Sequence, residues 1–171
     1  MRYRAKLLVS SLLAVASALL PGCPALDYDA GDAVLEITPE GATQTVLTHE
    51  PGRSEVRITP PAGGRFTATF VYLDPRAEVQ ITIEDSASAV QRDFVFPLDA
   101  HDGTLEIQFG EKKFGADAAT AQGSLTVERL DADDENISFR GIFQGTLMTG
   151  SGDRAAVDGF IDAQYTPSTK E

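Results

Sequence analysis

Residues 137–147 read ISFRGIFQGTL, and apolar side chains alternate with other residues there at the two-residue period of a β-strand. The apolar face of this strand carries Ile137, Phe139, Phe143 and Leu147. Gly141 and Gly145 lie inside the strand, and an interior glycine indicates a bulge or the close packing of another backbone. The stretch therefore predicts a long strand with one buried face.

The same alternation recurs along most of the chain. Strong apolar faces predict strands at 64–74, 77–85, 92–98, 104–109, 124–130 and 155–165. Weaker patterns predict strands at 33–37, 43–48 and 54–59. Phe160 is out of phase with its own strand, and the Ala-rich segment 115–123 has room for one helical turn. About ten short strands predict an all-β fold, an antiparallel β-sandwich or, as the alternative, a small β-barrel.

Turn-forming residues separate these strands. Segments 99–103 (DAHDG), 131–136 (DADDEN) and 149–153 (TGSGD) are predicted as hairpin connections. Pro60 to Gly64 is predicted as a surface loop within a single domain, because residues 24–59 are too few to fold alone.

The amino end has the pattern of a signal peptide. Arg2, Arg4 and Lys6 precede an apolar run from Leu7 to Leu20. A membrane-spanning helix needs about 20 apolar residues, so this run is too short to span and instead suits a secretory signal.

The segment that follows resembles the lipobox of bacterial lipoproteins. Leu20, Gly22 and Cys23 match the family's pattern, whereas Pro21 stands where a small or β-branched residue is usual. The resemblance implies a diacylglycerol on the sulfur of Cys23 and a second acyl group, such as palmitate, on the new amino terminus. Two chains anchor a protein stably where one does not.

The lipobox resemblance implies a cleaved signal peptide at 1–22 and a lipidated tether at 23–32, and the strand pattern predicts a single β-sandwich domain at 33–171. The membrane is then a partner through Cys23, and the outer membrane is the expected location, because Pro24 and Ala25 lack the Asp that retains many lipoproteins at the inner membrane. Ordinary secretion remains the alternative, with cleavage after Ala18 and a free thiol near the new terminus.

Charge narrows the choice of partners. Residues 1–22 carry 3 of the 14 Lys and Arg and none of the 26 Asp and Glu, so the remaining chain has a formal charge of −15. Nucleic acid is excluded as a partner, because its binding depends on Lys and Arg that neutralise phosphates. An envelope protein or a glycan remains open as a partner.

Residues for catalysis are few. His49 and His101 lie in turn-like segments, no serine occupies a G-x-S-x-G elbow, and the one cysteine is assigned to lipid. No catalytic residue and no cofactor is therefore expected. Tyr72 and Tyr165 fall in the apolar phase, which favours the core over a sugar-stacking platform.

The acidic turn is a weak calcium candidate. Its oxygen ligands would come from Asp131, Asp133, Asp134, Glu135 and Asn136. The segment lacks the glycine and the bidentate glutamate of an EF-hand loop, so a solvated turn is the preferred interpretation.

The C-terminal half resembles uncharacterised all-β bacterial lipoproteins over about a third of the chain; in those proteins an acidic turn leads into a strand with glycine and phenylalanine. The residues that carry this likeness are Gly123, Asp131, Ile137, Gly141, Phe143, Gly159 and Phe160. The expected function is a lipid-anchored, non-enzymatic binding or structural module of the envelope. The alternatives are a small-ligand or carbohydrate-binding β-sandwich and, less favoured, a carboxylate-based hydrolase; a transmembrane barrel is disfavoured by the lipobox and the charge.

Overall fold

The computed structural model describes residues 29–62, 64–84, 89–99, 101–132 and 136–165. This part of the chain forms strands and turns, and it holds no helix long and apolar enough to cross a membrane. The strands are β1 (Asp29–Pro39), β2 (Thr45–Thr48), β3 (Ser54–Ala62), β4 (Arg65–Tyr72), β5 (Ala77–Ile83), β6 (Arg92–Val95), β7 (Gly103–Phe109), β8 (Lys112–Gly115), β9 (Gln122–Ala132), β10 (Ile137–Met148) and β11 (Arg154–Tyr165).

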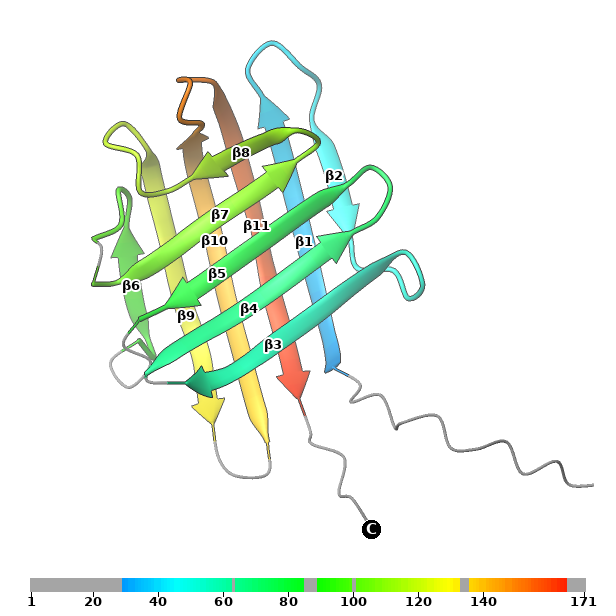
Figure 1. The fold of residues 1–171 in the computed structure, drawn as a ribbon, viewed down its shortest axis with the longest axis vertical. Coiled ribbons are helices and arrows are strands. Elements are labelled where there is room, and N and C mark those ends of the chain that lie inside the picture. Colours follow the sequence, from blue (N-terminus) through cyan, green and yellow to red (C-terminus); the bar gives the residue numbers. More distant parts are fainter. Residues whose placement is uncertain (1–28, 63, 85–88, 100, 133–135, 166–171) are drawn as a thin grey trace, which may run out of the picture.

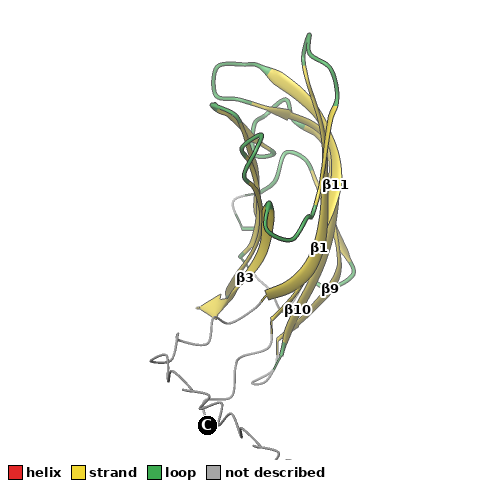
Figure 2. Ribbon diagram, turned by 90° about the vertical axis from the view of Figure 1, so that its right-hand side faces the viewer, coloured by secondary structure: helices red, strands yellow, loops and turns green. Residues whose placement is uncertain are grey.

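All eleven strands belong to one antiparallel sheet that curls into a half-barrel. Its main path runs β2-β1-β11-β10-β8-β7-β5-β4-β3, and β9 and β6 extend it beside β10. We call β1, β2, β6, β9, β10 and β11 the back portion, and β3, β4, β5, β7 and β8 the front portion; Figure 1 shows the front strands crossing the back ones diagonally. Figure 2 shows the two portions facing each other; among the described residues, one registered pair, Met148 with Gly115, joins them through the sheet.

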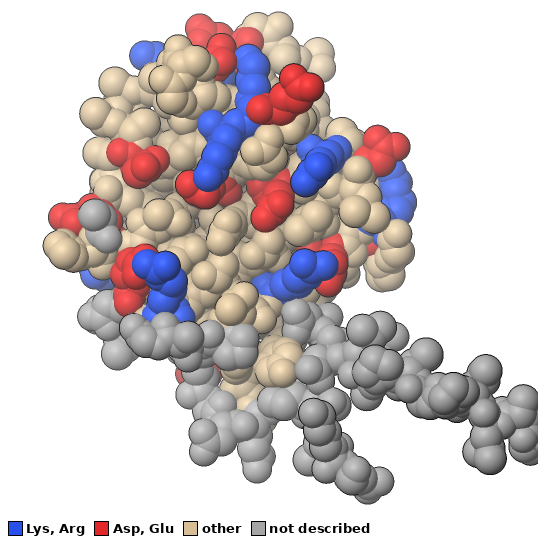
Figure 3. Space-filling model, in the orientation of Figure 1, with Lys and Arg blue, Asp and Glu red and all other residues tan. Residues whose placement is uncertain are grey.

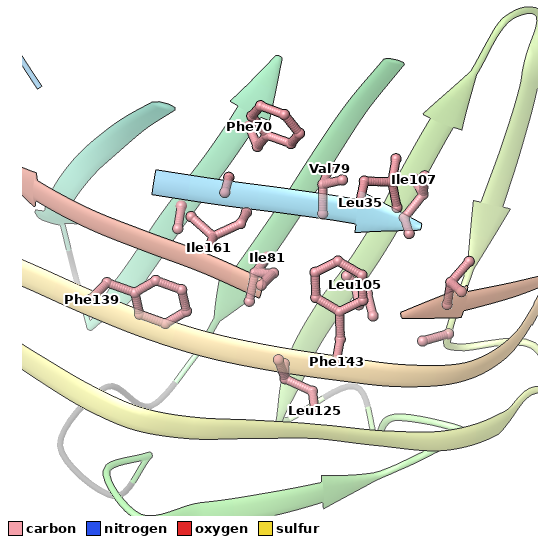
Figure 4. Close-up of a cluster of buried hydrophobic side chains, with 14 of the residues drawn as sticks. Leu35, Phe70, Val79, Ile81, Leu105, Ile107, Leu125, Phe139, Phe143 and Ile161 are labelled. Atoms are coloured by element: carbon pink, nitrogen blue, oxygen red, sulfur yellow. The ribbon is translucent and has the colours of Figure 1, made fainter. Parts of the chain in front are cut away.

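The core lies between the two portions. Each predicted apolar face is turned inward, as the burial of Phe66, Ile81 and Leu105 in front and of Phe139 and Phe143 behind shows. Figure 4 shows Phe139 and Phe143 reaching from β10 toward the front strands. The rings of Phe66 and Phe139 meet across the core with centroids 5.0 Å apart. Side chains therefore fill the space that the curled sheet encloses.

Glycines shape the back portion. The ring of Phe139 covers Gly141, and the ring of Phe143 covers Gly159. A Cβ at either glycine would come within 3 Å of that ring, so neither position has room for a side chain. Gly145 of β10 is registered opposite Gly123 of β9, with φ values of +149° and +141°. Only glycine adopts such angles without strain, so this pair allows a sharp bend in the sheet.

A β-bulge accompanies these glycines. Arg140 pairs with Arg129, but the next residue, Gly141, pairs with Val127, so Glu128 is the extra residue of β9. The bulge lets both Val127 and Leu130 face the core, although their spacing does not fit strict alternation.

The structure corrects four local expectations. Strand β8 was not predicted. Segment 99–103 is not a hairpin, because β6 pairs with β9 whereas β7 pairs with β5, and the segment crosses from the back portion to the front.

Strand β3 runs on through Pro60 and Pro61 to Ala62, so the expected loop is only a short turn. An edge strand tolerates proline because its outer N–H groups are not needed for pairing. The Ala-rich segment forms a turn closed by Ala121 N–H to the Ala118 carbonyl at 2.8 Å.

The hairpin predictions at 131–136 and 149–153 are confirmed, since β9 pairs with β10 and β10 with β11. Strand β1 begins at Asp29, inside the range 23–32 that the sequence assigns to a tether.

Candidate functional site

Two of the predicted features lie wholly or partly outside the described residues. Cys23 is one, and its lipidation stays a prediction. In the acidic turn, Asp131 and Asn136 are described and exposed, whereas 133–135 are not. Within the described residues no group of three or more His, Cys, Asp or Glu side chains could hold a metal, and the calcium candidate stays untested.

His49 has a hydroxyl neighbour. Ser54 Oγ lies 3.0 Å from His49 Nδ1, which is the separation of a nucleophile and its base. The same Oγ accepts the Glu50 N–H at 2.7 Å and lies 3.1 Å from the Glu50 carbonyl. The hydroxyl therefore closes the turn between β2 and β3, and no carboxylate among the described residues orients the far side of the ring.

His101 is exposed in the crossing segment. Its backbone N–H donates to Asp99 Oδ1 at 3.0 Å, as in an Asx turn. The two histidines belong to different turns, and no serine among the described residues contacts the His101 ring. Within the part of the chain that the structure describes, neither histidine has both a nucleophile and an orienting carboxylate beside it.

A polar groove of about 430 Å³ lies on the outer face of the front portion. We call it the front groove; it is lined by Arg76, Glu78, Gln80, Glu106, Gln108, Gly110 and Lys113. Alternation puts these side chains outside, because their neighbours Val79, Ile81 and Ile107 point into the core. Register then brings them together: Glu78 is opposite Gln108.

Some groups in the front groove are already paired. Lys113 Nζ lies 2.8 Å from Glu106 Oε2, and Gln108 Nε2 donates to the Gly110 carbonyl at 2.8 Å. The side chains of Arg76, Glu78 and Gln80 make no hydrogen bond or ion pair within the described part of the chain. The groove therefore presents a free guanidinium, a free carboxylate and a free amide.

A second hollow of about 320 Å³ continues the front groove. It shares Glu106 and Lys113 with the first and extends over Gly115, Asp117, Ala118, Met148, Thr149 and Gly150. Its far wall is the β10–β11 turn, which Asp153 holds in shape: the Asp153 N–H donates to Thr149 Oγ1 at 3.0 Å. Lys112 and then Ser151 donate to the Asp153 carboxylate, which lowers the pKa of that group.

Charges of both signs alternate across this face of the molecule, as Figure 3 shows. The front groove itself holds Arg76 and Lys113 against Glu78 and Glu106. It is therefore close to neutral, although the chain has a formal charge of −12.

A charged cluster on the opposite outer face has a structural role. Arg140 donates to Asp162 Oδ2 and to Glu128 Oε2, both at 2.8 Å, and these bonds raise the pKa of Arg140, Asp162 contributing most. Arg140 also lies over the ring of Phe160 at 5.2 Å, which explains why Phe160 is out of phase. Arg129 donates to the same Asp162, so the cluster ties β9, β10 and β11 across the bulge.

Two carboxylates line the front groove. Glu78 and Glu106 lie at its open surface, and Glu106 contacts the ammonium group of Lys113. Carboxylate oxygens in this position can accept hydrogen bonds from a ligand.

Sequence reasoning missed the front groove because it missed β8. The outward phase of Glu106 and Gln108 follows from alternation, but without β8 nothing places Lys113 beside them. The signal available was FGEKKFG at 109–115, in which Gly110 (φ +59°) makes a two-residue turn between Phe109 and Lys112.

Comparisons with protein-family models, with curated proteins and with solved structures found no match for this chain.

Proposed function

We propose that the protein is a lipoprotein of the cell envelope, anchored by lipid on Cys23 and acting as a non-enzymatic binding module, with the outer membrane as its location. The match of Leu20, Gly22 and Cys23 to the lipobox supports the anchor. The hydrogen-bonding groups of the front groove support the binding role.

One observation carries the proposal: the chain enters the domain at the end of the back portion opposite the second hollow, which continues the front groove. Asp29 is registered with Tyr165, and Tyr165 with Ile137, so these residues mark one end of the back portion. Met148 and Arg154 mark the other end, beside the second hollow. The twelve residues of β11 separate the two ends by about 36 Å.

The distance from the anchor supports the same orientation. Asp29 follows Cys23 by six residues, which span at most about 20 Å when extended. An anchor at Cys23 would therefore hold the Asp29 end near the lipid surface and turn the second hollow away from it.

We propose further that the curled sheet works as a β-sandwich with an outer binding face. Contact between the Phe66 and Phe139 rings and the complete burial of Ile81 and Ile107 support this, because a filled interior leaves binding to the outside. A barrel that stores a ligand inside would need the apolar lumen that these side chains occupy.

The test of the anchor is Cys23→Ser in the full chain, expressed with its own amino end. We expect the wild type to fractionate with membranes and to carry the mass of a diacylglycerol and an acyl chain. The serine variant should lose both, because serine offers no thiol for the diacylglycerol.

Pro21→Ala is the matched control, since it restores the usual small residue and should remain anchored. A serine variant that fractionates like the wild type would contradict the proposal. A mature terminus at Leu19 with an unmodified Cys23 would instead establish ordinary secretion.

A further inference from the structure

We propose that the front groove binds an oligosaccharide, with an acidic sugar unit beside Arg76. The inference rests on the proposed function in that it names the ligand of the binding module. It does not depend on the anchor.

The direction of the groove excludes the usual way of binding a peptide. Extended peptides add a strand to a free sheet edge, where backbone groups are available. The front groove instead lies across β5, β7 and β8, whose backbones are paired with one another from Ala77–Phe109 to Glu106–Gly115. A ligand there meets only side chains, so it must bring a high density of hydrogen-bonding groups of its own.

The free side chains match hydroxyl groups. Glu78 offers carboxylate oxygens that only accept, whereas the amide of Gln80 both donates and accepts. Gln108 uses its Nε2 on the Gly110 carbonyl, which leaves its Oε1 to accept. A sugar ring presents adjacent hydroxyls that donate and accept at once, so each of these groups finds a partner on the same ligand.

Arg76 would make the groove prefer a ligand that carries a negative charge. Its guanidinium is exposed, has no partner in the described part of the chain and lies at the edge of the groove. A carboxylate takes two parallel hydrogen bonds from such a group. The chain's formal charge of −12 disfavours a polyanion, so the ligand that fits is a mainly neutral chain with one acidic unit.

The second hollow sets the length of the ligand. Glu106 and Lys113 line both hollows, so a chain that fills the first can continue across this ion pair into the second. The volumes, about 430 and 320 Å³, each lie in the range of small-molecule sites. Together they suit a few sugar units rather than one.

The experiment uses the full chain in detergent and two matched probes: cellotetraose, and the same tetrasaccharide with its non-reducing terminal glucose oxidised to glucuronate. Binding is measured by calorimetry and mapped by amide chemical shifts. We expect both probes to perturb β5, β7 and β8, and the acidic one to bind more tightly. Arg76→Gln should weaken the acidic probe about fivefold, as expected for the loss of one ion pair at an exposed site, and leave the neutral probe unchanged.

Two further variants make the test specific. Gln80→Ala removes an amide from the groove and should weaken both probes. Arg65→Gln removes the same charge from the same outer face, where Arg65 pairs with Glu84 at 2.7 Å outside the groove, and should change neither. Melting temperatures of all three variants should match that of the wild type, because the substituted side chains are not in the core.

Several results would overturn the inference. These are no binding of either probe at millimolar concentration, shifts confined to another face, equal losses in Arg65→Gln and Arg76→Gln, or tighter binding of a tetrapeptide with one glutamate than of the acidic sugar. Failure of the anchor would appear only in the fractionation of Cys23→Ser, so the two proposals fail separately.

Discussion

The front and back portions cover the same core by different means. In front, β3, β4 and β5 contain no glycine, and β7 and β8 have it only at their ends. In the back, glycine lies inside β1, β9, β10 and β11, at Gly31, Gly123, Gly141, Gly145 and Gly159. Apart from the register shift between Thr59 and Ala62 of β3, the front is an ordinary pleated surface, whereas the back combines interior glycines, overlying phenylalanine rings and a bulge.

The difference shows where the curl of the sheet originates. Glycine kinks and bulges are the means by which a sheet acquires strong local curvature. The pair Gly123–Gly145 lies close to Met148, where β10 passes from pairing with β9 to pairing with β8. The back portion therefore contains the residues that curve the sheet, and the front portion provides a regular outer face for the groove.

The largest expected effect comes from breaking the contact between the portions. Phe139 is fully buried and touches Phe66, so Phe139→Asp would place an unpaired charge in the core. We expect a loss of more than about 5 kcal/mol, enough to unfold a domain of ordinary stability. Circular dichroism should show no cooperative melt, and an unchanged melting temperature would contradict the assigned face.

A smaller effect should distinguish a glycine that bends the sheet from a glycine in an ordinary turn. At Gly145 a Cβ would lie 2.1 Å from the Gln122 carbonyl oxygen, at φ +149°, so we expect Gly145→Ala to cost about 3 to 5 kcal/mol in unfolding free energy. Gly110→Ala is the control, because a Cβ there meets nothing within 4 Å; its φ of +59° should cost only about 1 kcal/mol. Equal losses of unfolding free energy in the two variants, measured by denaturant unfolding, would show that the close glycine pair does not determine the bend of the sheet.

The smallest effect concerns the exposed ion pair between the portions. Lys112 of β8 lies 3.3 Å from Asp153 in the β10–β11 turn and lowers the pKa of that carboxyl from its ordinary 3.8. A depressed pKa in the folded state means that the contribution to stability is present above about pH 3.8 and is lost as the pH falls through the lowered value.

Lys112→Gln should therefore raise the pKa of Asp153 toward 3.8, as followed by carboxyl NMR, with little change in melting at neutral pH. Lys113→Gln, which removes the neighbouring charge but not this contact, should leave the titration where it is. A titration that does not respond to Lys112→Gln would assign the lowered pKa to Ser151 and the turn.

Alternation was sufficient to predict the regular parts of the molecule. It placed the strands of the front portion except β8, and it assigned the inward faces of β4, β5 and β10, because burial on one side of a pleated strand imposes a period of two. It also marked Gly141 and Gly145 as sites of a bulge or close packing.

Sequence alone could not identify which residues these features pair with, because the pairing depends on contacts between segments far apart in the chain. The same holds for most residues of the candidate site. Nothing near Gly145 in the sequence identifies Gly123 as its neighbour, and nothing near Arg140 shows that Glu128 is the bulged residue. The four-residue strand β8 is too short for a periodic signal, and with it Lys113 and the front groove were missed.

The register of β1 with β11 has a mechanical consequence. All eleven residues of β1 are paired with β11 in antiparallel register, and the chain enters at Asp29. If the domain is held at that end and a ligand pulls at the other, the tension runs along β1. Hydrogen bonds between antiparallel strands lie perpendicular to the strand direction, so this load acts on the whole set in shear at once rather than opening one pair after another.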